Sequence, residues 1–142
     1  MDEEKIYQNM PEHYLLCYNE ECEQAANCLR RLAAKYGSPA DAVLQVVNPR
    51  LNRGLTCKYR KPKKVVTMAY GMLHTYDKVL AKDIGSLRGA IKDYFGNGSY
   101  YLRRNGKRPV TPAEQQYISK IFRSHGYADG AVFDRYVDEV EW

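Results

Sequence analysis

The sequence lacks any apolar run long enough to cross a membrane. A membrane-spanning helix needs about 18 or more consecutive apolar residues, and the chain contains no such stretch. Its first residues, MDEEKIYQNMPEHY, are acidic and polar, whereas a secretory signal begins with a basic segment and continues with an apolar one. We therefore expect a cytoplasmic protein without a membrane partner, a setting in which standing disulfides are disfavoured.

The motifs of common catalytic sites are also missing. The patterns G-x-S-x-G, H-E-x-x-H and G-x-x-x-x-G-K-[ST] do not occur. The three histidines, His13, His74 and His125, lie in unrelated contexts. A catalytic thiol at Cys17 or Cys28 would need a histidine beside it in space, and only His13 is near in sequence. An enzyme is therefore the least supported class of function, and no catalytic residue is predicted.

Linkers and repeats are absent as well, and the length is that of one domain. Typical domains contain roughly 100–200 residues, and this chain has 142. Such a chain can bury an apolar core of its own. We expect a single domain over residues 1–142. The acidic composition leaves open a flexible N-terminal segment over residues 1–16.

Most of the regular structure that the sequence indicates is helical. The clearest case is residues 111–126, where Thr111 is a suitable N-cap, Pro112 takes the first position and Glu114 completes a capping box. Apolar side chains at helical spacing then form a face that can pack on a core. Similar patterns predict further helices over residues 22–36, 38–48, 83–95 and 131–142.

Turn signals after the helix predicted over residues 83–95 indicate a small β element. The pair Asn105-Gly106 could close a hairpin between residues 99–104 and residues 107–110. Proline cannot donate a backbone hydrogen bond, so Pro109 would confine the return strand to a sheet edge.

The middle of the chain is harder to assign. Residues 64–80 fit either a β segment or a helix broken at Gly71, and residues 50–64 indicate a basic loop. Together these patterns predict a mainly α (α+β) fold. We expect a compact helical domain with a small β-hairpin and a basic loop.

The net charge of +5 is unevenly distributed along the chain. Residues 1–28 carry seven acidic side chains and one basic side chain, whereas residues 50–108 carry fifteen basic and three acidic ones. Residues 109–142 are again acidic, with six acids and three bases. A basic middle suits a polyanionic partner such as nucleic acid. A solvated surface, whose acidic ends partly neutralise its middle, explains the pattern equally well.

Two stretches of the basic middle combine cations with tyrosines. Residues 57–64, CKYRKPKK, have five bases in eight positions, and residues 100–108, YYLRRNGKR, have four beside two tyrosines. Cations neutralise phosphates, and tyrosine rings can stack on exposed bases. The plainer explanation is a solvated loop and a sheet edge whose charges prevent strand pairing. The candidate nucleic-acid-binding residues are Lys58, Arg60, Lys61, Lys63, Lys64, Arg103, Arg104, Lys107 and Arg108.

The four cysteines, Cys17, Cys22, Cys28 and Cys57, match the number of ligands in a tetrahedral zinc site. Their spacing, C-x4-C-x5-C-x28-C, differs from the familiar pairs of C-x2-C. In one continuous helix Cys22 and Cys28 would lie about 9 Å apart along the axis and about 240° apart around it. Two thiols so placed cannot share an ion, so metal binding requires the helix to begin after Cys22.

An earlier helix start would remove the metal site. Asn19 is an equally suitable N-cap, with two glutamates in the first turn. Cys22 would then join the apolar stripe as a small core residue, as free cysteines often do. Spacing alone slightly favours this packing role. A disulfide from Cys57 to Cys17 or Cys22 ranks third, because a cytosolic setting disfavours it.

Five blocks spread along the chain resemble a known family. They are CYNEECEQAANCLR, VVNP, CKYRK, SYYLRRNGKRPVTPAEQQYISKIFRSHG and FDRYVDEVEW, which cover about half of the chain. The blocks resemble an uncharacterised domain-of-unknown-function family of Bacteroidetes bacteria. The resemblance places family cysteines at Cys17, Cys22, Cys28 and Cys57, although a proline typically follows the last one, where this chain has Lys58.

The resemblance implies no activity, because the family's function is unassigned. It does favour the four cysteines as metal ligands, with structural zinc as the expected cofactor and an iron–sulfur cluster as the alternative. We therefore expect a regulatory zinc-site protein that binds nucleic acid through its basic middle. The alternative function is a protein–protein interaction module that binds no nucleic acid. The sequence leaves the oligomeric state open.

Overall fold

The computed structural model describes residues 4–37 and 39–142, and these residues form two compact units. Unit 1 contains the described residues up to Val66 together with Glu139–Trp142, and unit 2 contains Thr67–Asp138. Unit 2 is thus a continuous insertion in the sequence of unit 1. The expectation of a single domain over residues 1–142 stays a prediction. None of the helices described has the length and apolar character needed to span a membrane.

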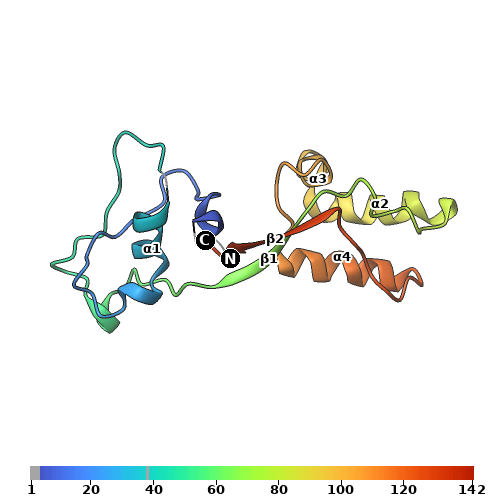
Figure 1. Cartoon of the computed structure of the whole chain (residues 1–142). Coiled ribbons are helices and arrows are strands. Elements are labelled where there is room, and N and C mark those ends of the chain that lie inside the picture. The colour runs from blue at the N-terminus through green and yellow to red at the C-terminus, as the bar shows by residue number, and fades with distance from the viewer. Residues whose placement is uncertain (1–3, 38) are drawn as a thin grey trace. The chain divides into compact units, whose positions relative to one another are not determined.

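The sheet consists of two antiparallel strands, β1 (Val65–Tyr70) and β2 (Arg135–Val140) (Figure 1). β1 shows that the first part of residues 64–80 is a strand, which ends at Tyr70 just before Gly71 with its φ of 84°. β2 shows that the helix predicted over residues 131–142 is wrong. Two β-branched valines in β2 suit a strand, and pairing with the distant β1 supplies its hydrogen bonds.

Unit 2 has three helices, α2 (Ala81–Phe95), α3 (Asn97–Arg104) and α4 (Pro112–Ser124), and α2 packs against both of the others (Figure 1). The predicted capping box of α4 is confirmed, because the Glu114 amide donates to Thr111 Oγ1 over 3.3 Å and the Thr111 amide donates to Glu114 Oε2 over 2.9 Å. The buried core consists of Ala69, Met72, Tyr76, Leu87, Ile91, Tyr100, Val110, Ile118, Phe122 and Phe133.

The fold is α+β, as the sequence predicts, but the predicted hairpin over residues 99–110 is wrong. All of its first strand, residues 99–104, belongs to α3, which carries the fully buried Tyr100 into the core. Only the far end of the segment pairs with a strand, because Val110 forms an isolated antiparallel bridge with Ala69 of β1. Burial of a large tyrosine at helical spacing outweighs the turn signal of Asn105-Gly106.

Unit 1 has little regular structure. Its one α-helix is α1 (Leu29–Tyr36), and three 3-10 helices accompany it over Lys5–Tyr7, Ala25–Asn27 and Gly54–Thr56. Four buried side chains form its core, and four partly buried ones pack against them. The core residues are Ile6, Tyr7, Leu29 and Val140, and the packed residues are Tyr14, Leu32, Tyr36 and Trp142.

The helix predicted over residues 38–48 is wrong in the part that the structure describes. Ser38, its expected N-cap, lies outside the described residues. From residue 39 onward the backbone is irregular, and Val46 forms a parallel bridge with Leu16. The Leu16 amide donates to the Gln45 carbonyl over 3.0 Å, and the Val47 amide donates to the Leu16 carbonyl over 2.9 Å. Pairing with a distant segment therefore replaces the local helical bonds.

Candidate metal centre and basic segments

The start of α1 determines where Cys22 and Cys28 lie. α1 begins at Leu29 with Cys28 as its N-cap residue, and the 3-10 turn over Ala25–Asn27 precedes it. Asn19 does not cap the helix, because its Oδ1 accepts from the nearby Glu21 amide over 3.2 Å. The helix therefore begins after Cys22, and the interpretation of Cys22 as part of a helical core stripe is wrong. The geometric objection to a shared ion no longer applies.

Backbone hydrogen bonds hold two other segments against the first turns of α1. The Cys17 amide donates to the Arg30 carbonyl over 3.2 Å, which brings the first cysteine to the helix. On the side of the basic loop, the Leu29 amide donates to the Lys61 carbonyl over 2.7 Å. Cys17 and Cys28 are thus held beside the segment after Cys57, which is distant from both in sequence.

The Arg30 side chain strengthens this arrangement. Its Nε donates to the Tyr59 carbonyl over 2.7 Å, and its Nη1 donates to the Leu15 carbonyl over 3.1 Å. The guanidinium also lies 5.2 Å from the ring centre of Tyr14. Burial raises the pKa of Tyr14, and the positive charge of Arg30 opposes this rise. One side chain of α1 thus ties the segment around Cys17 to the segment around Cys57.

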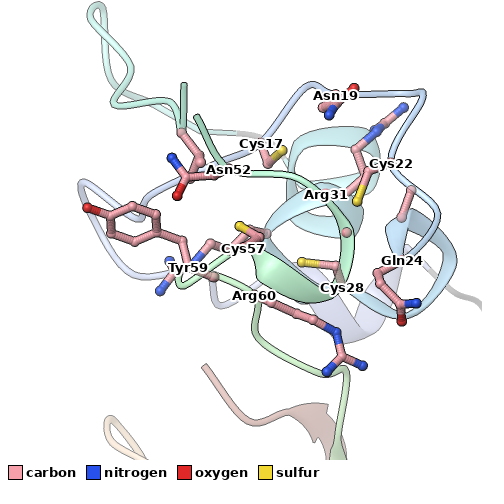
Figure 2. A pocket seen from close by; sticks show the side chains of 14 residues that line it. Cys17, Asn19, Cys22, Gln24, Cys28, Arg31, Asn52, Cys57, Tyr59 and Arg60 are labelled. Atoms are coloured by element: carbon pink, nitrogen blue, oxygen red, sulfur yellow. The ribbon is translucent and has the colours of Figure 1, made fainter. Parts of the chain in front are cut away.

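All four cysteines line one cavity of unit 1 (Figure 2). The space that a water-sized sphere can occupy there is ≈ 20 Å³, which is room for about one such sphere. Cys28 is buried, the other three cysteines are half-buried, and all four are free thiols. The cavity therefore joins soft donor groups from three segments around a space the size of a single atom or small molecule.

The four thiols do not form a ready-made ligand shell. Across residues 4–37 and 39–142, no three His, Cys, Asp or Glu side chains are arranged so that they could hold a metal ion. Rotation of cysteine side chains between staggered positions changes where each sulfur points. A metal would therefore require these side chains to turn toward a common point.

Two arginines that line the same cavity were not expected to lie beside the thiols. The Nε atoms of Arg31 and Arg60 are buried and have no hydrogen-bond partner among the described residues. Arg60 was assigned to nucleic-acid binding, and Arg31 was not assigned at all. The signal for Arg31 was its position three residues after Cys28, one turn into the helix. A buried donor without a partner is costly, so this cavity suits an acceptor or an anion.

The basic loop after Cys57 offers some cations to solvent and uses others within unit 1. Lys58 is exposed, and Lys61 is half-buried. Lys64 Nζ lies 3.1 Å from a carboxylate oxygen of Glu141, and both side chains are largely exposed. Lys63 Nζ lies 5.9 Å from the ring centre of Tyr7.

The second basic segment belongs to unit 2, and one of its arginines has a structural role. Arg103 Nη2 lies 3.1 Å from Glu114 Oε1, and its guanidinium lies 4.3 Å from the ring centre of Phe95. Lys107 and Arg108 are exposed. Arg103 therefore links α3 to the start of α4, whereas Lys107 and Arg108 face solvent.

Comparison with protein-family models places the chain in one family. The model described as a family of unknown function, DUF6078, matches residues 1–142. The chain belongs to this family. The match confirms the resemblance carried by the five sequence blocks, and it covers the four cysteines and both basic segments of this DUF6078 member. Searches of curated proteins and of solved structures returned no match.

Proposed function

We propose that this DUF6078 member holds one structural zinc ion through Cys17, Cys22, Cys28 and Cys57, and that it binds nucleic acid through the basic segment that the ion anchors. The observation that carries the proposal is the cavity of unit 1, because cysteines from three separated segments line it. Four thiolates are a common ligand set for structural zinc. The ion would supply no reaction; it would hold the segments together.

The size of the unit 1 core supports a structural metal. Among the described residues, unit 1 buries eight apolar side chains and unit 2 buries twelve, and most of the chain of unit 1 is irregular. Small units with a limited core are commonly stabilised by disulfides or metals. The four cysteines are free, so a metal is the cross-link that remains available to them.

The unpartnered arginine nitrogens support a negatively charged occupant. Four thiolates around Zn²⁺ carry a net charge of about −2. Arg31 and Arg60 line the same cavity with buried Nε atoms that lack acceptors in the described residues. Their N–H groups could donate to thiolate sulfurs, which would orient the ligands and offset their charge. One Zn²⁺ ion needs only these four thiols, and an iron–sulfur cluster with the same ligand set is the alternative.

The position of the basic loop connects the metal to nucleic-acid binding. Cys57 begins the segment that contains Lys58, Lys61 and three further cations. An ion on Cys57 would fix one end of this segment, while the bond from Leu29 to the Lys61 carbonyl holds it at α1. A fixed row of cations binds phosphates at a lower entropic cost than a mobile one.

Elemental analysis of the purified chain tests the metal. We expect about one zinc per chain, as one tetrahedral site predicts, and loss of that zinc in Cys57→Ser. Thr56→Ser is the matched control, because it changes the neighbouring residue and preserves the hydroxyl that donates to the Arg53 carbonyl. Iron in place of zinc would support the cluster, and equal zinc in both variants would contradict the proposed ligands.

Anisotropy titrations with labelled DNA and RNA test the second half of the proposal. We expect salt-dependent binding that weakens in the double variant Lys58→Gln, Lys61→Gln. The double variant Lys5→Gln, Lys35→Gln removes the same charge from exposed positions of unit 1 outside the loop. If the wild-type chain binds neither nucleic acid at low salt, this function is wrong.

Exposed apolar side chains favour a protein partner as the second candidate. Val43, Leu51 and Leu55 are 84 %, 80 % and 77 % exposed in the irregular part of unit 1. Exposed apolar groups mark a contact surface where they gather into one patch. Affinity capture that recovers one defined protein without nucleic acid, and loses it in Leu51→Ser, Leu55→Ser, would support an interaction module.

A further inference from the structure

Three cations of unit 2 surround one exposed tyrosine. Arg88 and Lys92 are four residues apart on α2, so they share a face of that helix. Arg104 is the last residue of α3. Lys92 Nζ donates to the hydroxyl of Tyr101 over 3.0 Å, and it lies 4.9 Å from the centre of that ring. We call Arg88, Lys92, Arg104 and Tyr101 the α2–α3 cluster.

The electrostatic surroundings of the tyrosines show that the three charges act at one place. The hydrogen bond and the charge of Lys92 lower the pKa of Tyr101, and Arg104 and Arg88 lower it further. The same two arginines oppose the raised pKa of Tyr76, whose main cause is burial. Arg88 also lies 5.5 Å from the ring centre of Tyr76. Arg88, Lys92 and Arg104 therefore all act on the hydroxyl of Tyr101.

This positive charge is not balanced by nearby acids. In the described parts of the chain, none of the three cations lies within 4.0 Å of a carboxylate oxygen. Arg103, in contrast, is paired with Glu114. The only hydrogen bond from the Arg104 guanidinium that the structure describes goes to the side chain of Asn105. Like charges held together without a counter-ion repel one another, and an added anion relieves that repulsion.

We propose that the α2–α3 cluster is a phosphate-binding site for the backbone of single-stranded nucleic acid. One guanidinium group can donate two parallel hydrogen bonds to the oxygens of one phosphate, and a lysine ammonium adds a compact positive charge. Tyr101 is 40 % exposed beside the cations and offers an aromatic surface to a base next to the bound phosphate. The proposal refines the nucleic-acid binding proposed above. It adds Arg88 and Lys92, which sequence reasoning did not single out.

Titration with labelled oligouridylate and oligothymidylate tests this site. We compare the wild-type chain with the triple variant Arg88→Gln, Lys92→Gln, Arg104→Gln. The control triple variant, Lys78→Gln, Lys82→Gln, Lys120→Gln, removes equal charge from exposed positions of the same unit. We expect the first variant to lose about tenfold or more in affinity, and the slope of log K against log salt to shrink by about 2, since each lost phosphate contact accounts for about 0.7. The control should bind within about threefold of wild type.

A second measurement covers the case in which the triple variant fails to fold. In the wild-type chain carrying ¹³C-labelled tyrosines, oligouridylate should shift the signal that Tyr101→Phe removes. The single variants Arg88→Gln and Arg104→Gln should each weaken that shift.

Three outcomes would overturn the proposal, and they can be told apart. Oligonucleotide binding that is unchanged in the first triple variant would contradict this site and leave the proposed function intact. No oligonucleotide binding by wild type at low salt would contradict both proposals. Cluster-dependent binding of anionic phospholipid vesicles or of a phosphopeptide, without oligonucleotide binding, would show that the partner is a different polyanion.

Discussion

Arg31 and Arg60 line the cysteine cavity from different segments, and each buries Nε without a partner in the described chain. A guanidinium offers hydrogen-bond donors and no acceptor, so each buried Nε–H calls for an acceptor beside it. An ion pair partly neutralises the charge of Arg31, because its Nη2 lies 3.2 Å from Glu20 Oε1. Its Nε still needs an acceptor. Thiolate sulfurs on a metal would provide one.

Removing these guanidiniums should weaken zinc binding. We expect Arg31→Gln and Arg60→Gln each to lower zinc affinity about tenfold, because groups that hydrogen-bond to metal ligands commonly contribute that much. Competition with a chromogenic chelator measures the effect. Arg50→Gln, an exposed position outside the cavity lining, should keep wild-type affinity. Equal affinity in all three variants would mean that the two arginines do not contact the ligands.

Tyr101 should ionise at a lower pH than an ordinary tyrosine. Its pKa is lowered from 10.0, chiefly by the hydrogen bond from Lys92. The unfolded chain lacks this bond, so it keeps the Tyr101 proton to higher pH than the folded chain does. The contribution of Tyr101 to the free energy of unfolding therefore grows as pH rises through its folded pKa toward 10.0 and is absent at lower pH.

The measurement for Tyr101 is a ¹³C NMR titration of the tyrosine signals, with Tyr101→Phe for assignment. Lys92→Met should move the Tyr101 pKa back toward 10.0. Lys82→Met, which changes an exposed lysine on the same helix, should leave it in place. If Lys92→Met leaves the Tyr101 pKa unchanged, the hydrogen bond from Lys92 to the Tyr101 hydroxyl is not formed in solution.

At the scale of the element, α4 depends on its N-terminal cap. Thr111 and Glu114 bond to each other's backbone amides, and Glu114 also pairs with Arg103. Thr111→Ala should lower the free energy of unfolding of unit 2 by about 1 kcal/mol, the usual cost of losing such a cap. Urea unfolding followed by far-UV circular dichroism measures it. Thr111→Ser keeps the hydroxyl and should stay close to wild type.

Elements whose signals are local could be predicted from the sequence. The cap, the proline and the apolar stripe of α4 lie within one stretch, and they agree. β2 was mistaken for a helix because its partner, β1, lies across the whole insertion of unit 2. The segment after Ser38 was mistaken for the same reason, since its partner is Leu16. Local propensity cannot show a hydrogen bond to a distant strand.

The candidate site was only partly visible in the sequence. The count of cysteines and the family resemblance pointed to all four thiols, and the structure places all four at one cavity. The cluster around Tyr101 was missed, because Arg88 belongs to a helix that was judged by its apolar face. The role of Arg30 was missed as well, because its acceptors are the carbonyls of Leu15 and Tyr59. Such contacts depend on tertiary structure alone.

At the scale of the whole molecule, the two units differ in what stabilises them. Unit 2 has three helices around a continuous apolar core, whereas unit 1 has one helix and a small core. If zinc supports unit 1, its removal should affect the two units unequally. A structural metal stabilises the part of the chain that supplies its ligands, so its loss should destabilise that part most.

Hydrogen exchange of the full chain, with and without a strong chelator, should show this inequality. We expect amides of unit 1, including that of Leu29, to lose protection when the chelator is added. Amides in the middle of α2 and α4 should keep theirs. Without any chelator, the Cys57→Ser variant should show the same loss of protection as the wild-type chain shows with chelator. Equal loss of protection in both units would contradict separate stabilisation, and no loss in either would contradict a structural metal.

The insertion of unit 2 also sets an order of events during translation. Val140 belongs to the core of unit 1 and Trp142 packs against it, yet the ribosome makes both only after all of unit 2. The nascent chain therefore presents Ile6, Tyr7 and Leu29 without their last partners while unit 2 is synthesised and can already fold. All four cysteines, in contrast, precede unit 2. If the cavity holds zinc, an ion bound at that stage would hold the early segments together until the final strand is made.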